Sequence, residues 1–360
     1  MKRHHVSTLT ALVASGGLCA ASVAAAKIEF APSSGASVTK SFQHTMELSL
    51  DNMNMLINGE ESGLLPDIEM SLTMEQIVRV TDTYAASSGG RPTKLSRTFD
   101  ELGWDADVDI QIDIMGSTQD QNQTMSGVSE LEGKTVAFTW NDEDAEYKKS
   151  FDGEDGDSEL LEGIEEDMDL RVLLPPGEVS EGDEWPIEVA KLRAILSPGG
   201  NLAILPEDLP GLEDLSMMGN GLGAGSMSDM VGDILEGEAF GIFKGYREVD
   251  GVKVAVIEVR IDIESSNDLT DAVQELMDDI ELPAEIGDLE LDHMEMEFGF
   301  EAEGRLLWDV SAGRMFSFEL SGDTELQVDQ GLSINAQGND MNMQQTVELS
   351  GTLNISVSVE

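Results

Sequence analysis

Apolar and acidic residues alternate one by one along much of this chain. The segment from Trp104 to Met115 shows the pattern most clearly. Its apolar residues are Ala106, Val108, Ile110, Ile112 and Ile114, and the acidic residues between them are Asp105, Asp107, Asp109 and Asp113. Successive side chains of a β-strand point to opposite faces, so a period of two predicts a strand with one buried and one solvated face.

The same alternation returns at intervals along the rest of the chain. The clearest further segments are Met46–Leu50, Ile68–Met74, Ala255–Ile263, Met294–Phe300 and Val347–Val359. Near Asp51 the apolar positions slip by one residue, which predicts a β-bulge. We therefore expect a mainly β fold with a few helices. It would form a large curved antiparallel sheet or an open or half barrel.

The middle of the chain lacks this periodicity. Residues 198–236 are rich in Gly, Pro, Met and Leu and predict a long irregular loop or lid. This segment separates a β-rich N-terminal half, 27–197, from a β-rich C-terminal half, 237–360. The second half contains one amphipathic segment, 267–280, which predicts a helix with Asn267 or Asp268 as its cap. Two similar β halves are one hypothesis, and chance similarity between hairpins is the alternative.

The first 26 residues have the pattern of a secretory signal peptide. A basic start is followed by an apolar run and by Ala24, Ala25 and Ala26, which predict cleavage after Ala26. The alternative is a lipoprotein signal at Cys19, but Leu18 stands where a small residue is usual. We expect export to the periplasm or the cell exterior, with no integral membrane segment in the mature chain. Because Cys19 is the only cysteine, the mature chain would have no thiol chemistry.

The net charge narrows the choice of partners. The sequence has 72 Asp and Glu against 20 Lys and Arg, a formal net charge of -52. Nucleic acid is excluded as a natural partner, because binding to phosphates requires basic patches. Acids on alternate strand positions favour a solvated outer face that keeps the protein in solution.

Several short motifs between Arg97 and Gly200 together carry a resemblance to known proteins. They are Arg97-Thr98-Phe99, Leu161-Glu162-Gly163 through Asp169-Leu170, Leu173-Leu174-Pro175, Gly182-Asp183-Glu184-Trp185 and Ser197-Pro198-Gly199-Gly200. In these motifs the chain resembles an uncharacterised family of exported bacterial β-rich proteins with a Gly-Asp-x-Trp element. That resemblance implies no known activity. The pattern of long strands is also loosely similar in architecture to lipoprotein-carrier half-barrels, which cannot assign a function.

One acidic loop is dense enough to be a candidate metal site. Its oxygen-bearing residues are Asp152, Glu154, Asp155, Asp157 and Glu159, interleaved with two glycines. Hard cations such as Ca²⁺ prefer clusters of this kind, although the spacing differs from that of an EF-hand. The alternative is an acidic loop that is only solvated. No cofactor other than Ca²⁺ is expected.

The sequence offers little support for catalysis. It has no G-x-S-x-G nucleophile motif. His44 and His293 lie on predicted strands, where we expect surface or hydrogen-bonded histidines. Carboxylates are so abundant that no catalytic pair can be singled out. Met-x-Met pairs at strand spacing favour core packing over copper binding.

Three functional hypotheses remain. The first is an exported, non-enzymatic β protein that binds a hydrophobic small molecule or lipid on a curved sheet, covered by residues 198–236 and 267–280. The second is a calcium-assisted structural or cell-surface protein. The third is a secreted hydrolase that uses a carboxylate pair.

Overall fold

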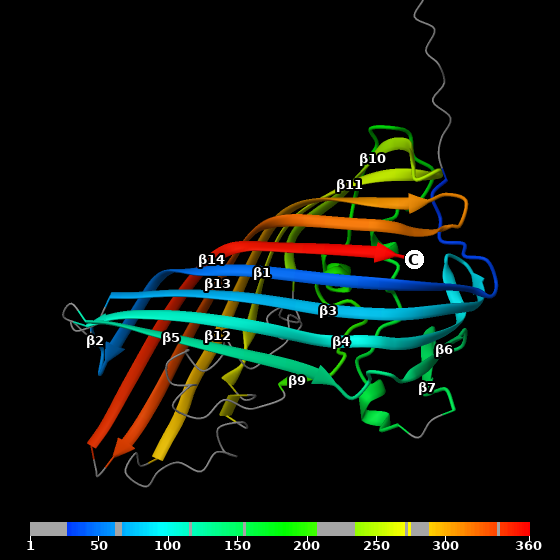
Figure 1. The fold of residues 1–360 in the computed structure, drawn as a ribbon. Coiled ribbons are helices and arrows are strands. Elements are labelled where there is room, and N and C mark those ends of the chain that lie inside the picture. The colour runs from blue at the N-terminus through cyan, green and yellow to red at the C-terminus, as the bar shows by residue number, and fades with distance from the viewer. Residues whose placement is uncertain are drawn as a thin grey trace, which may run out of the picture.

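The structure is a computed structural model that describes residues 27–61, 67–114, 117–153, 156–206, 235–270, 273–274, 288–336 and 339–360. Within these residues, 14 strands belong to one large antiparallel sheet (Figure 1). The prediction of a mainly β protein built on a curved antiparallel sheet is confirmed. None of the helices in the described ranges is long and apolar enough to cross a membrane.

Long strands dominate both ends of the chain. The N-terminal strands are β1 (Ala36–Ile57), β2 (Glu60–Glu61), β3 (Asp67–Ser88), β4 (Arg91–Ile114), β5 (Ser117–Ser129), β6 (Thr135–Asn141) and β7 (Glu146–Phe151). The C-terminal strands are β10 (Leu235–Val249), β11 (Val252–Asp268), β12 (Asp288–Asp309), β13 (Arg314–Ala336) and β14 (Asn339–Val359). Tight turns such as Val249–Val252, with Asp250 and Gly251 at positive φ, join neighbouring strands.

A segment of short elements lies between these two groups of strands. It contains η1 (Ser158–Leu161), η2 (Arg171–Leu173), β8 (Glu184–Pro186), η3 (Val189–Leu192), α1 (Arg193–Leu196) and β9 (Ile204–Pro206). We refer to residues 156–206 as the covering segment. Of the expected loop 198–236, residues 207–234 lie outside the described residues. Of the expected helix 267–280, residues 267 and 268 belong instead to β11. Residues 271–272 and 275–280 of that expected helix lie outside the described residues.

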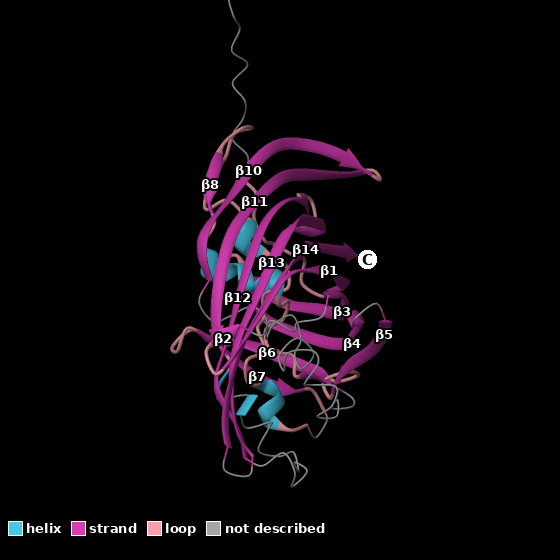
Figure 2. Ribbon diagram, turned by 90° about the vertical axis from the view of Figure 1, so that its left-hand side faces the viewer, coloured by secondary structure: helices cyan, strands magenta, loops and turns pink. Residues whose placement is uncertain are grey.

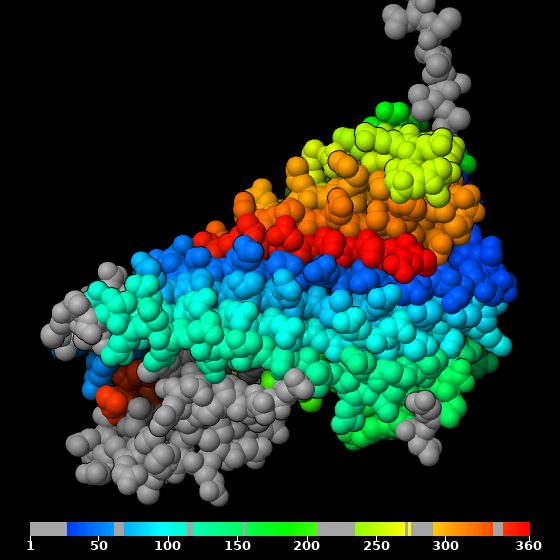
Figure 3. All heavy atoms as spheres, viewed as in Figure 1, coloured from blue at the N-terminus to red at the C-terminus, as the bar shows by residue number. Residues whose placement is uncertain are grey.

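The N-terminal and C-terminal strands form a single continuous sheet. The strand order is β7-β6-β4-β3-β1-β14-β13-β12-β11-β10-β8, and β5 pairs with β4 and β9. The two groups meet where β1 pairs with β14, and these strands lie side by side in the blue and red bands of Figure 3. In the described residues the order ends at β7 and β8, so the sheet is open.

The sheet has one acidic face and one apolar face, as the alternation predicts. Asp105, Asp107 and Asp109 are exposed on the outer face, whereas Ala106 and Val108 between them are buried on the inner face. The register of β1 against β14 shifts between Leu50 and Asn52, which confirms the predicted bulge. This extra residue keeps the apolar side chains on the inner face along the whole strand.

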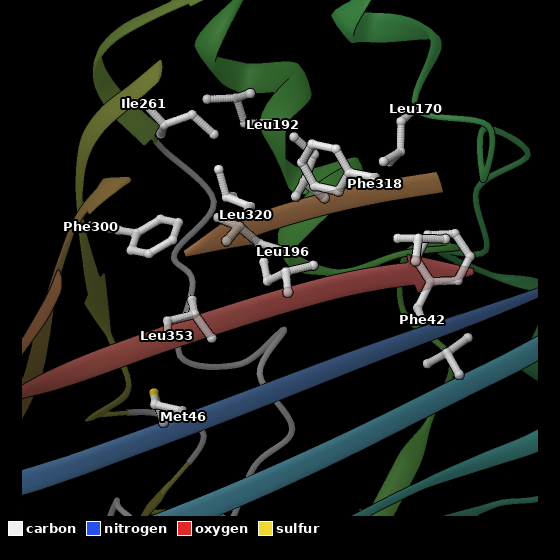
Figure 4. Packing of buried hydrophobic residues seen from close by; sticks show 14 of the residues in the cluster. Phe42, Met46, Leu170, Leu192, Leu196, Ile261, Phe300, Phe318, Leu320 and Leu353 are labelled. Carbon is white, nitrogen blue, oxygen red and sulfur yellow. The ribbon is translucent and has the colours of Figure 1, made fainter. Parts of the chain in front are cut away.

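The covering segment packs against the inner face. Figure 2 marks its short helices in cyan, and Figure 4 shows Leu192 and Leu196 pointing from them toward Leu320 and Leu353 of the sheet. All four side chains belong to one buried apolar cluster. Burial of this apolar surface is the main force that holds the segment on the sheet.

Candidate functional site

A network of buried ion pairs lies on the inner face, near the start of β1. Lys40 Nζ lies 2.9 Å from both Asp82 Oδ2 and Asp169 Oδ1 and donates a hydrogen bond of 2.7 Å to Tyr84 Oη. Tyr84 Oη in turn donates to Asp169 Oδ2 at 2.7 Å. Arg97 donates two hydrogen bonds to Asp82, from Nε to Oδ1 at 2.7 Å and from Nη2 to Oδ2 at 2.9 Å. All five side chains are at most 1% exposed.

This network fastens the covering segment to the sheet. Lys40, Asp82 and Arg97 come from β1, β3 and β4, whereas Asp169 comes from the covering segment. Arg97 also donates to the backbone carbonyls of Glu165 and Glu166 at 2.9 and 2.8 Å. Burial alone would raise the pKa of Asp82, but the charges of Arg97 and Lys40 lower it to about 2. Each buried charge therefore has an opposite charge beside it.

A second group of charges continues the network toward the surface. Arg171 Nη2 donates to Glu166 Oε2 at 2.5 Å, and Arg171 Nε donates to Asp167 Oδ1 at 2.9 Å. Burial raises the pKa of Glu166 to about 7, against the effect of the Arg171 charge. These residues extend the ion pairs that shape the covering segment.

Three residues further along the inner face are buried with polar atoms that have no partner among the described residues. His44 on β1 is paired in register with Gln76 on β3, and Gln76 is paired with Trp104 on β4. They are only 1%, 6% and 3% exposed. Within the part of the chain that the structure describes, both ring nitrogens of His44, Oε1 of Gln76 and Nε1 of Trp104 lack a hydrogen-bond partner. We call these residues the polar row.

The polar row is uncharged. Burial lowers the pKa of His44 to about 4, so its imidazole is neutral at neutral pH. A neutral imidazole has one N–H donor and one acceptor nitrogen. Together with the Trp104 N–H and the Gln76 oxygen, the row offers two donors and two acceptors. Buried polar groups in proteins are almost always paired, so this row departs from the rule.

A glycine on β5 leaves room for the indole of Trp104. Gly127 on β5 pairs with Trp104, and a Cβ added at Gly127 would lie 2.2 Å from Trp104 Nε1. Only a glycine leaves room for the ring there. The indole of Trp104 therefore lies against the backbone of β5 at Gly127.

Beyond the polar row, the far end of the inner face is less covered. Along β1 and β3, the inward-facing apolar side chains are fully buried at Met46 and Leu72 and become half-buried toward this end of the sheet. Six apolar side chains there are half-buried, and we call them the far end: Leu50, Met53, Ile68, Met70, Ile112 and Met343. These six residues come from β1, β3, β4 and β14 and leave part of an apolar surface in contact with solvent.

The predicted calcium loop is only partly described. Asp152 follows β7 in a bend, and Asp157 caps η1 by accepting a hydrogen bond from the backbone N–H of Glu159 at 3.0 Å. Glu154 and Asp155 lie outside the described residues. In the part of the chain that is described, no three His, Cys, Asp or Glu side chains are grouped to hold a metal ion. Calcium binding by this loop stays a prediction.

Sequence reasoning missed the ion network and misjudged His44. The expectation of a surface or hydrogen-bonded His44 is wrong, because the side chain is buried and has no hydrogen-bond partner in the described ranges. A usable signal existed: Lys40 and Asp82 occupy apolar positions of their strands, next but one to Val38 and Val80. A charged residue in the apolar phase of a strand indicates a buried ion pair.

Comparisons with known proteins give no family for this chain. No family model matches it, and no curated protein matches it. Among solved structures, an outer membrane channel from Pseudomonas putida F1 aligns over 92% of this chain and 98% of its own, with 8% identity and a TM-score of 0.20. The β domain of the Bordetella autotransporter BrkA covers 88% and 98% with 11% identity and a TM-score of 0.13. OccK7 of Pseudomonas aeruginosa covers 90% and 98% with 7% identity and a TM-score of 0.17. These scores are too low to support an argument about fold or function.

Proposed function

We propose that this chain is an exported, non-enzymatic β protein that binds a hydrophobic small molecule or lipid on the inner face of its sheet. The half-buried apolar far end carries the proposal. Apolar residues nearer the covering segment, such as Met46 and Leu72, are fully buried, whereas the six apolar residues of the far end remain partly in water. Contiguous exposed apolar surface on a soluble protein marks a place where a ligand or partner binds.

The residue types of the far end suit such a ligand. Met53, Met70 and Met343 are three of its six residues. Methionine is unbranched and flexible, so it adapts to an irregular apolar partner better than a β-branched residue does. Covering apolar surface contributes roughly 25 cal/mol for each Å² removed from water.

A neutral apolar dye tests the proposal. The chain without residues 1–26 would be purified, delipidated and titrated with Nile red, whose fluorescence rises in an apolar site. We expect saturable binding in the wild type. The double variant Met53→Gln with Met70→Gln should bind about tenfold more weakly, because its two new amides would lose solvation beside the ligand. The matched control is Glu69→Gln, on the exposed neighbour of Met70.

Two results would contradict the proposal. One is a delipidated wild type that does not bind Nile red. The other is equal binding by the wild type and the double variant. The export part has its own test, which is the N-terminal sequence of the protein recovered outside the cytoplasm. Cleavage after Ala26 would give Lys27 as the first residue.

A further inference from the structure

The sheet has one long strand edge with which no described residue pairs. Residues Ser117–Met125 of β5 pair with β4 on one side, whereas on the other side β9 reaches only residues 127–129 (Figure 1). We call Ser117–Met125 the β5 edge. Its backbone N–H and C=O groups that point away from β4 are a template on which another strand can pair.

The other edges of the sheet carry features that discourage such pairing. At one end of the strand order β7 contains Lys148 and Lys149, and at the other end β8 has only three residues and includes Pro186. Five residues of β10, beside β8, are charged. The β5 edge is nine residues long, has no proline and carries a single charge, that of Asp120. In a chain with 26% charged residues, this low charge makes the β5 edge the most receptive of these edges to another strand.

The inner side of the β5 edge is complementary to itself. Gln119, Gln121 and Gln123 lie in register with apolar residues of β4 and share their face. In an antiparallel pair of two β5 edges with Gln121 on a two-fold axis, Gln121 faces its own copy and Gln119 faces Gln123. Amide side chains both donate and accept hydrogen bonds, so each of these pairs matches. An axis at Asn122 would instead set Gln119 opposite Met125.

The outer side matches in the same arrangement. With the axis at Gln121, Asp120 of each copy faces Asn122 of the other. Asn122 Nδ2 donates to Asp109 Oδ1 at 2.7 Å, and the second hydrogen of this amide can be donated to the facing carboxylate. An axis at Asp120 would place two aspartates face to face, which is unfavourable. Both sides of the strand therefore favour the same centre.

We propose that a second copy of this chain pairs with the β5 edge, antiparallel and with Gln121 on the two-fold axis. The inference concerns a different surface from the proposed function and does not depend on it. The paired strands would run side by side for roughly 30 Å. One strand against one strand is a smaller contact than a standard interface of about 800 Å² per partner, so we expect a weak dimer.

Sedimentation velocity of the chain without residues 1–26 tests the proposal. We expect a dimer with a dissociation constant in the micromolar range. It should be about tenfold tighter in about 1 M NaCl than in about 0.05 M, because salt screens the repulsion between two acidic molecules. Gln121→Glu should weaken the dimer about tenfold, because two carboxylates would face each other on the axis. The matched control is Gln43→Glu, which adds the same charge at an exposed position of β1 and should change the dissociation constant by less than about twofold.

Cysteine cross-linking tests the register. Facing residues of an antiparallel pair have Cα atoms about 4.5–5.5 Å apart, which is within the range of a disulfide. The chain without residues 1–26 has no cysteine. Under mild oxidation Gln121→Cys should therefore form a covalent dimer with itself, whereas Gln119→Cys should cross-link mainly when it is mixed with Gln123→Cys. Gln43→Cys is the control and should remain uncross-linked. Circular dichroism spectra check that each variant is folded.

Three results would overturn the inference. The first is a wild type that stays monomeric at high concentration and high salt. The second is a dimer that Gln121→Glu does not weaken or that Gln121→Cys does not cross-link, because the two copies would then meet at another surface or in another register. The third is a monomer in which the backbone amides of the β5 edge exchange slowly with deuterium. That result would identify another part of the same chain as the occupant of the edge.

Discussion

Lys40 and His44 lie four residues apart on the inner face of the same strand, and both are 1% exposed. Lys40 contacts Asp82, Tyr84 and Asp169 at hydrogen-bond distance. His44 has no hydrogen-bond partner on either ring nitrogen among the residues that the structure describes. The two residues therefore share a strand, a face and a degree of burial, and differ only in how their polar atoms are paired.

Buried polar side chains occur on this sheet in two arrangements, the ion network and the polar row. In the ion network, partners from β1, β3, β4 and the covering segment meet in one place, so the charges specify how that segment docks. A buried ion pair contributes little net stability, but removing one member is costly. In the polar row no partner is supplied by the described residues, so each unpaired atom lowers the stability of the folded chain.

The largest effect is expected from breaking the ion network. Asp82→Ala should lower the free energy of unfolding by about 3–5 kcal/mol, because Lys40 and Arg97 would be left buried without their shared carboxylate. Urea unfolding measures the change. The control is Asp323→Ala, an exposed aspartate of the outer face, with an expected change within about 0.5 kcal/mol. A small effect of Asp82→Ala would show that the network does not carry the docking of the covering segment.

The next effect is a pH dependence that belongs to the polar row. The pKa of His44 is about 4 in the folded protein against 6.5 when unperturbed, so the unfolded chain takes up a proton first as the pH falls. The stability from neutral His44 is complete above pH 6.5 and is lost as the pH falls toward 4, by about 3 kcal/mol in all.

The variant His44→Leu should lack this component. Urea unfolding of both proteins between neutral pH and about pH 4 measures the difference in slope. Asp82 contributes in another range, because its lowered pKa makes stability fall only below about pH 4, toward 2. Parallel pH profiles for wild type and His44→Leu would mean that His44 is not buried as described.

A smaller effect is expected where the polar row meets β5. Gly127→Ala should destabilise the protein by about 1–3 kcal/mol, because the new methyl group overlaps the Trp104 indole. Gly299→Ala is the matched control, since its added Cβ would meet only Glu325 Cβ at 3.9 Å. Thermal unfolding followed by Trp fluorescence measures both. Equal melting temperatures for the two variants would show that the indole has another position.

The smallest effect has the opposite sign. Gln76→Leu should stabilise the delipidated protein by about 1 kcal/mol, because it removes a buried unpaired amide oxygen and keeps an apolar side chain of similar size. Gln43→Leu on the exposed face should change stability by less than about 0.5 kcal/mol. A clear loss of stability in Gln76→Leu would indicate that Gln76 already has a partner.

Much of the fold could be predicted because a strand encodes its two faces locally. The alternation around Val108 and Asp109 predicts the buried and exposed faces, and the phase slip near Asp51 predicts the bulge that the register confirms. The order of the strands could not be predicted in this way. The pairing of β1 with β14 joins residues such as Lys40 and Val359, which are far apart in sequence and share no local signal.

The candidate sites show the same limit. The sequence places Lys40 and Asp82 at apolar positions of their strands, but it does not give the partner of either residue. Whether each finds a partner depends on which strands lie next to one another and on where the covering segment returns to the sheet. Register places Gln76 beside His44, and the docked segment places Asp169 beside Lys40.

The sequence by itself determined the strand faces, the acidic exterior and the bulge, because each depends on residues close together along the chain. Only the tertiary structure decided which buried polar groups are paired, because pairing requires residues from distant strands to meet within hydrogen-bond distance. The arrangement of the strands pairs Lys40 with Asp82 and Asp169, and it leaves His44 without a hydrogen-bond partner among the described residues.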